Sequence, residues 1–150
     1  MTNTTYKKQM DKVLKGFDFE RFLVLFGQYS INPDKDIVFY KTIVMVYYLS
    51  IQNFSKFYLL IQSCANEYEK YVFALEVYES IRTCNIKSIE DQIKDSDKIF
   101  KKLLQQIKEN IINSNKLTKN NVANEESLLK TNNVDNNIAD CCFIVKNFKR

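Results

Sequence analysis

The sequence predicts a mainly α-helical protein of stacked helical hairpins, with a small helix-strand element at its C-terminal end. Only 2 glycines and 1 proline occur in 150 residues, which leaves few of the tight turns that an all-β protein needs. Apolar residues recur at helical spacing through most of the chain. A helix-turn-helix sequence pattern also occurs twice, at residues 48–57 and 78–89. Each copy contains one asparagine in its turn, and these residues, Asn53 and Asn85, are 32 positions apart. This spacing is close to the period of stacked helical hairpins.

Cap residues delimit the first two predicted helices. Residues 3–15 carry apolar side chains on one face, and Gly16 follows as a helix stop. Asp18 suits the N-cap of a second helix, because its carboxylate can accept a hydrogen bond from a backbone N–H of the first turn. That helix carries apolar and aromatic residues up to Ser30. The chain is therefore expected to begin with two consecutive helices.

The clearest boundary is Asn32-Pro33-Asp34, which predicts a third helix over residues 33–52. Asparagine suits the N-cap, and proline suits the first helical position. Asp34 and Asp36 would then lie in the first turn, where the helix dipole favours negative charge. Apolar residues cover most faces of this helix, which is typical of a helix sandwiched between neighbours.

Three more helices are predicted, over residues 54–67, 68–83 and 86–113. Asn53 or Ser55 is the candidate N-cap of the first of them. The last is expected to kink or break near residues 95–97, because Ser96 and Asp97 can compete for backbone hydrogen bonds. Together with the preceding helices they make residues 1–113 a helical repeat region.

Composition changes after this region. Residues 114–133 are polar and rich in asparagine, which indicates a linker or short helices. Residues 134–150 form the predicted helix-strand element, because residues 142–148 are enriched in β-branched and aromatic side chains. A lone strand must pair with another strand of this chain or with the sheet edge of a partner.

No catalytic or metal-binding constellation is present in the sequence. Histidine is absent, so a Cys-His or Ser-His pair and a mixed zinc site cannot be assembled. Two glycines cannot build a Gly-rich phosphate loop. The cysteines lack C-x-x-C spacing and are interpreted as buried reduced thiols: Cys64, Cys84, Cys141 and Cys142. We expect no enzyme activity, cofactor, metal or small-molecule ligand.

Charged and aromatic residues each have a structural and a functional interpretation. Carboxylate pairs are interpreted as helix N-terminal charge or as solvated faces: Asp34/Asp36, Glu90/Asp91 and Asp95/Asp97. Helical spacing favours core packing over base stacking for the tyrosines Tyr47, Tyr48, Tyr58, Tyr68, Tyr71 and Tyr78. Three lysines are assigned to the solvated side of the last helix rather than to a phosphate-binding stripe: Lys101, Lys102 and Lys108.

Charge and hydropathy bound the location of the protein. The net charge of +4 is spread along the chain, so nucleic-acid binding is allowed but not indicated. The longest apolar stretch is far below the ~20 residues of a membrane span. The N-terminus lacks the apolar segment of a signal peptide. We expect a protein of the cytoplasm, the nucleus or both, without membrane contact.

One segment resembles the helical-repeat segments of small PCI-domain proteins: residues 40–58, with the pattern Tyr40-x-x-x-Val44-x-Val46-Tyr47-Tyr48-Leu49-x-x-Gln52-Asn53-Phe54-x-x-Phe57-Tyr58. This family includes the smallest PCI subunits of the proteasome regulatory-particle lid and of the COP9 signalosome, and subunit k of translation initiation factor three. Their helical array leads into a winged helix. The chain departs from the pattern at residues 113–133, which are short and polar where a complete winged helix has two apolar helices.

The resemblance implies a non-catalytic scaffold subunit of a large intracellular complex, most specifically of the proteasome lid. It implies assembly by helical stacking and by strand pairing between winged helices, a form of β-augmentation. Phe143, Val145 and Phe148 are then the partner-binding residues. The alternatives are a stand-alone helical regulator of one protein machine and, third, a nucleic-acid-binding protein that uses its basic C-terminal region.

Overall fold

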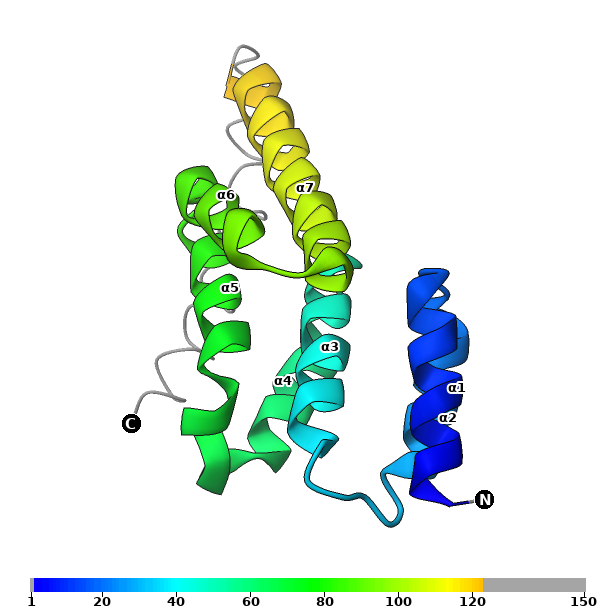
Figure 1. Ribbon diagram of the computed structural model, residues 1–150. Coiled ribbons are helices and arrows are strands. Elements are labelled where there is room, and N and C mark those ends of the chain that lie inside the picture. The colour runs from blue at the N-terminus through cyan, green and yellow to red at the C-terminus, as the bar shows by residue number, and fades with distance from the viewer. Residues whose placement is uncertain (1, 123–150) are drawn as a thin grey trace.

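The computed structural model describes residues 2–122, and the side chains through residue 115. Within this range the chain is helical, so the mainly α-helical part of the predicted fold class is confirmed there. The elements are α1 (Asn3–Lys15), α2 (Phe19–Tyr29), α3 (Ile37–Ser50), α4 (Phe54–Ser63), the 3₁₀ helix η1 (Ala65–Tyr71), α5 (Val72–Arg82), α6 (Ile86–Asp95) and α7 (Lys98–Val122) (Figure 1). None of the described helices is long and apolar enough to cross a membrane. The predicted C-terminal strand lies outside the described residues.

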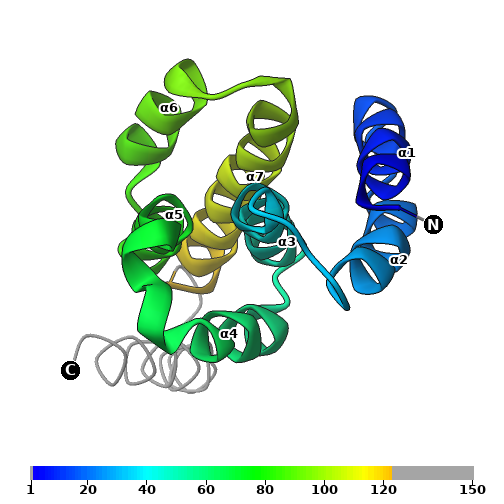
Figure 2. The same ribbon diagram turned by 60° about the horizontal axis from the view of Figure 1, so that its bottom comes forward.

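Helix α3 lies at the centre of the molecule. It packs against α7, α4 and α5, while the α1–α2 pair covers its other side (Figure 2). Its side chains Ile43, Met45 and Val46 are fully buried. Burial on several faces explains why its sequence is apolar nearly all round, as predicted for a sandwiched helix. Helix α7 also packs along α6, so that it covers the core between α3 and α6.

Three consecutive helix pairs, α1–α2, α3–α4 and α5–α6, are joined by the same turn. In each turn the second residue after the first helix has a positive φ, which is 57° at Phe17, 60° at Gln52 and 53° at Cys84. The next N–H in each turn bonds back to the last turn of the first helix: Asp18 to Val13 O at 3.0 Å, Asn53 to Tyr48 O at 2.9 Å and Asn85 to Ser80 O at 2.9 Å. These bonds define a Schellman motif at each helix end.

The residue after each positive-φ position is the N-cap of the following helix. Asp18 Oδ1 accepts a hydrogen bond from the Arg21 N–H at 3.2 Å. The equivalent bonds run from Lys56 N–H to Asn53 Oδ1 at 3.3 Å and from Ser88 N–H to Asn85 Oδ1 at 3.1 Å. The turn that the sequence pattern marks at Asn53 and Asn85 therefore occurs a third time, at Asp18. The helix before Asp18 does not end in the Tyr-x-Ser-Ile sequence found at residues 48–51 and 78–81, and the first turn was missed for that reason.

The connection from α2 to α3 differs from the prediction. Helix α3 begins at Ile37, with Asp36 as N-cap residue, rather than at Pro33. The Asp34 carboxylate is engaged elsewhere, since its Oδ1 accepts the Asp36 N–H at 3.0 Å and its Oδ2 binds Lys7. This local Asx turn competes with a helical first turn. Asp34 and Asp36 are therefore not first-turn charges of α3, and that prediction was wrong.

The remaining helix boundaries agree in part with those predicted from the sequence. Helix α4 ends at Ser63, and η1 separates it from α5, where the sequence predicted two adjoining α-helices. The break near residues 95–97 is confirmed, because Ser96 is extended and its Oγ donates to Gln92 O at 2.6 Å. Asp97 Oδ1 then accepts the Phe100 N–H at 3.1 Å at the start of α7. Helix α7 continues past Asn113, where its end was predicted, to Val122.

Candidate interaction groove

The described part of the chain has an open groove where the first two helix pairs meet α7. Its volume is about 450 Å³, within the range of small-ligand and side-chain pockets. The lining comes from three segments and consists of Phe17, Phe19, Tyr47, Ser50, Ile51, Gln52, Lys102, Leu103, Gln106 and Asn110. Two of the three repeated turns, at Phe17 and at Gln52, thus open into one depression. We call this depression the interaction groove.

Aromatic rings form the apolar part of the interaction groove. Phe19 and Tyr47 stack with ring centroids 5.1 Å apart and an angle of 18° between their planes. Phe17 is 39% exposed, and Lys102 Nζ lies 5.5 Å from its ring centroid, within cation–π range. Ile51 is 49% exposed. Burial raises the pKa of the Tyr47 hydroxyl, and the nearby Glu20 carboxylate adds to that rise.

Ser50, Gln106 and Asn110 of the interaction groove take part in side-chain hydrogen bonds. Asn110 Nδ2 donates to Ser50 O at 2.8 Å, so α7 satisfies a carbonyl at the C-terminal end of α3. Gln106 Nε2 donates to Asn110 Oδ1 at 3.1 Å. Ser50 Oγ donates to Tyr47 O at 2.6 Å. The Asn110–Ser50 bond thus ties α7 to the end of α3, and the other two bonds orient the side chains on either side of it.

The lining chemistry suits binding rather than bond making. Among the lining residues Lys102 carries the only formal charge, and they include neither a carboxylate nor a thiol. Such a surface can accept apolar side chains and a few hydrogen bonds from a partner. Within residues 2–122, no group of three or more cysteine or carboxylate side chains is placed to hold a metal ion.

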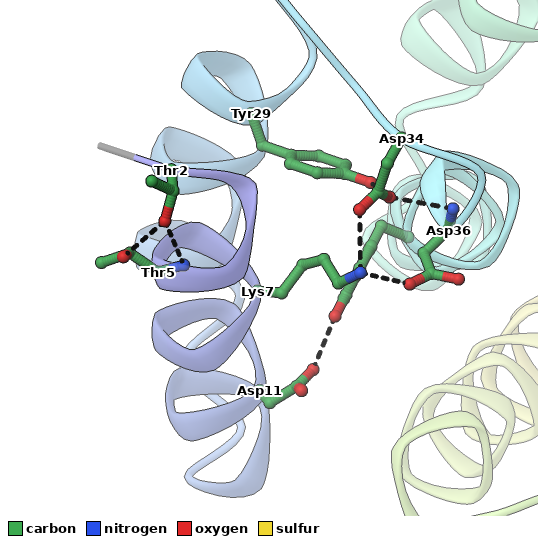
Figure 3. Close-up of polar contacts among 8 residues, drawn as sticks. Thr2, Thr5, Lys7, Asp11, Tyr29, Asp34 and Asp36 are labelled. Carbon is green, nitrogen blue, oxygen red and sulfur yellow. Dashed lines mark hydrogen bonds and ion pairs between the residues drawn. The ribbon is translucent and has the colours of Figure 1, made fainter.

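A second polar cluster joins α1 to the segment before α3 (Figure 3). Lys7 Nζ lies 2.8 Å from Asp34 Oδ2 and 2.5 Å from Asp36 Oδ2, and the Tyr29 hydroxyl donates to Asp34 Oδ1. Lys7 and then Tyr29 hold the pKa of Asp34 at about 2. Burial, followed by the bond to Asp34, raises the pKa of Tyr29 to about 12. The cluster positions α1, and we name it the Lys7 clamp.

The sequence-derived candidates fall into three groups in the structure. Phe143, Val145 and Phe148, like Cys141 and Cys142, lie outside the described residues, so the strand-pairing site stays a prediction. Tyr71 and Tyr78 are buried, which confirms core packing for those two tyrosines. Cys64 is also buried, but Cys84 is exposed at its positive-φ position, so the buried-thiol interpretation was wrong for Cys84.

Three lysines of α7 were assigned to its solvated side. Lys101 and Lys102 are exposed, as predicted, although Lys102 also contacts the Phe17 ring. Lys108 is half-buried and lies 3.0 Å from Glu90 of α6, so that pair ties the two helices together. The interaction groove itself was not predicted, because its lining comes from segments up to 93 residues apart and only the turn at residues 51–53 gave a local signal.

Comparisons with protein-family models, with curated proteins and with solved structures found no match. The resemblance of residues 40–58 to small PCI-domain proteins therefore remains a prediction from the sequence.

Proposed function

We propose that this protein is a non-catalytic scaffold subunit of a large protein assembly. The observation that carries the proposal is the recurrence of one turn, with the same Schellman bonds and the same capping bond, at three helix pairs. Repeated helix pairs of this kind stack into arrays whose surfaces bind other proteins. The interaction groove, where the first two pairs meet α7, supplies a largely apolar contact surface for such a partner.

The lid of the proteasome regulatory particle is the most specific assembly that we propose. This choice depends on the resemblance of residues 40–58 to small PCI-domain subunits. In such a subunit the helix pairs would contact neighbours laterally, and a C-terminal strand with Phe143, Val145 and Phe148 would pair with a neighbouring sheet edge. Both kinds of contact require folded neighbours rather than a substrate.

Native affinity purification of the tagged protein from its own cells tests the proposal. Size separation and mass spectrometry would then identify the proteins that travel with it. A megadalton particle with other helical-repeat subunits is the expected result. A one-to-one complex with a single protein would instead identify a stand-alone regulator, and would contradict the scaffold role. Dependence of recovery on added nuclease, with steep loss at higher salt, would identify a nucleic-acid-binding protein.

The strand-pairing part of the proposal has its own test. Phe143→Asp together with Val145→Asp should release the protein from its particle, because two buried charges would oppose strand pairing with a neighbour. The circular dichroism of the helical region should stay unchanged. Unaltered co-migration of the double variant would contradict strand pairing while leaving the helical contacts in place.

A further inference from the structure

Lys102 carries the only formal charge in the lining of the interaction groove, and it has no acidic partner there. Among the described residues, no carboxylate lies within ion-pair distance of its ammonium group. Asp18 is used as a helix cap and accepts the Arg21 N–H at the start of α2. Asp97 accepts the Phe100 N–H at the start of α7 in the same way. The positive charge of the groove is therefore not balanced by an acid of the described chain.

Helix α7 extends this positive charge along one wall of the groove. Lys98 lies one turn before Lys102 on the same side of the helix, and both side chains are exposed. Gln106 and Asn110, which follow Lys102 at the same spacing, line the groove and are uncharged. Like charges four positions apart destabilise a helix, and α7 has no acidic residue in its first turn to offset them. The wall is thus positive at its N-terminal end and neutral beyond it.

The aromatic rings of the groove favour a peptide over a nucleic acid as the source of the complementary negative charge. Phe19 and Tyr47 stack on each other, with centroids 5.1 Å apart, and Lys102 Nζ lies over the Phe17 ring. Each ring therefore has one face already occupied, whereas a nucleobase stacks on an open face. Phe17 and Ile51 remain 39% and 49% exposed. This remaining surface suits an apolar side chain.

We propose that the interaction groove binds an acidic segment of a partner protein, in which a carboxylate lies close to a large apolar side chain. The apolar side chain packs against Phe17 and Ile51, and the carboxylate pairs with Lys102. Lys102 Nζ lies 5.5 Å from the Phe17 ring centroid, so the two partner groups must be near neighbours, as at positions i and i+4 of a helix. Lys98 adds to the positive potential at that end. This inference rests on the proposed function, because it states the chemistry of the partner that the scaffold binds.

Selection of a random peptide library, displayed on phage, against the immobilised full-length protein tests the proposal. The enriched peptides should share an aspartate or glutamate within about four positions of an aromatic or large aliphatic residue. A synthetic peptide with that consensus should bind the wild type, and Lys102→Glu should weaken its binding about tenfold. A glutamate near the start of α7 suits the helix dipole, so this variant should stay folded. Fluorescence anisotropy of the labelled peptide measures the affinity.

Two comparisons assign the effect to the groove. Lys87→Glu is the matched control, because Lys87 is an exposed residue of α6 outside the groove and its substitution changes the net charge equally. This variant should bind the peptide like the wild type. A peptide whose acidic residue is replaced by lysine should bind Lys102→Glu better than the wild type. A library without enriched peptides, a consensus without an acidic residue, equal binding by Lys102→Glu, or displacement of the peptide by a single-stranded oligouridylate would overturn the proposal.

The acidic-partner proposal and the scaffold proposal fail separately. Peptide binding is measured on the purified protein, whether or not the protein belongs to a large particle. Recovery of the same particle with tagged wild type and with Lys102→Glu would overturn the acidic partner and leave the scaffold role in place. Recovery of a one-to-one complex that Lys102→Glu disrupts would support the acidic partner and contradict the scaffold role.

Discussion

The turns within the helix pairs and the connection between α2 and α3 are built in different ways. Each turn within a pair is closed by bonds between residues three to five apart, ending in the caps Asp18, Asn53 and Asn85. The α2–α3 connection is instead held by Lys7, which lies 27 and 29 residues from its two partners, Asp34 and Asp36. The first kind of turn is specified by adjacent residues. The second exists only after α1 has packed against α2.

A substitution in the buried core should lower the stability of the protein more than any change in the turns or in the α2–α3 connection. Ile43 is fully buried in α3, which contacts the other helix pairs and α7. Ile43→Ala should destabilise the protein by ~2–5 kcal/mol through lost burial and a residual cavity. Leu59→Ala, at a 64% exposed position of α4, should change the free energy of unfolding by less than about 0.5 kcal/mol. Urea denaturation monitored by circular dichroism measures both, and equal effects would contradict the central place of α3.

Loss of a cap should break one repeated turn. Asp18→Ala, Asn53→Ala and Asn85→Ala should each cost about 1 kcal/mol, because each change leaves a first-turn N–H without its acceptor. The three values should agree within about 0.5 kcal/mol if the turns are equivalent, apart from the added dipole interaction of the Asp18 charge. Replacing each residue by serine, which also caps, should recover most of the loss. A negligible effect at one site alone would show that the three turns are not equivalent.

The positive-φ positions should allow a gain in stability. Gln52 and Cys84 adopt left-handed backbone conformations that cost a side-chain-bearing residue about 1 kcal/mol and cost glycine little. Gln52→Gly should therefore stabilise the protein by up to ~1 kcal/mol, whereas Gln52→Ala should leave it nearly unchanged. Thermal unfolding of the pair compares the two substitutions at one site. A destabilised glycine variant would show that the Gln52 side chain makes contacts that outweigh the backbone strain.

Removing the Lys7 clamp should change the stability least at neutral pH. It should also change how the stability depends on pH. The pKa of Asp34 is about 2 in the folded chain and 3.8 ordinarily, so its ionised form stabilises the fold. That contribution is complete above about pH 4 and is lost as the pH falls through about 2. Denaturation of Asp34→Asn over this range should show a shallower loss of stability than the wild type. Asp91→Asn, at an exposed site on α6, is the control and should follow the wild type.

The same contrast explains which parts of the fold could be predicted. Asn53 and Asn85 reveal their turns because an asparagine cap next to a helix end has a short, recognisable pattern. Asp34 was misassigned because its distant partner Lys7 leaves no local trace, and Pro33 fits an N-terminal helical position by itself. The interaction groove was missed for a related reason. Phe17, Ile51 and Lys102 come together only through the packing of α7 on α3, which periodicity does not specify.

We propose that this helical chain binds partner proteins through the interaction groove. The most direct measurement compares the native complexes recovered with tagged wild type, Ile51→Lys and Leu59→Lys. Both substitutions place a lysine at an exposed apolar position, but only Ile51 lines the groove, and a cation at this end of α3 suits the helix dipole. We expect Ile51→Lys to lose co-purifying subunits and Leu59→Lys to retain them, with both variants folded. Full recovery of the complex with Ile51→Lys would contradict it.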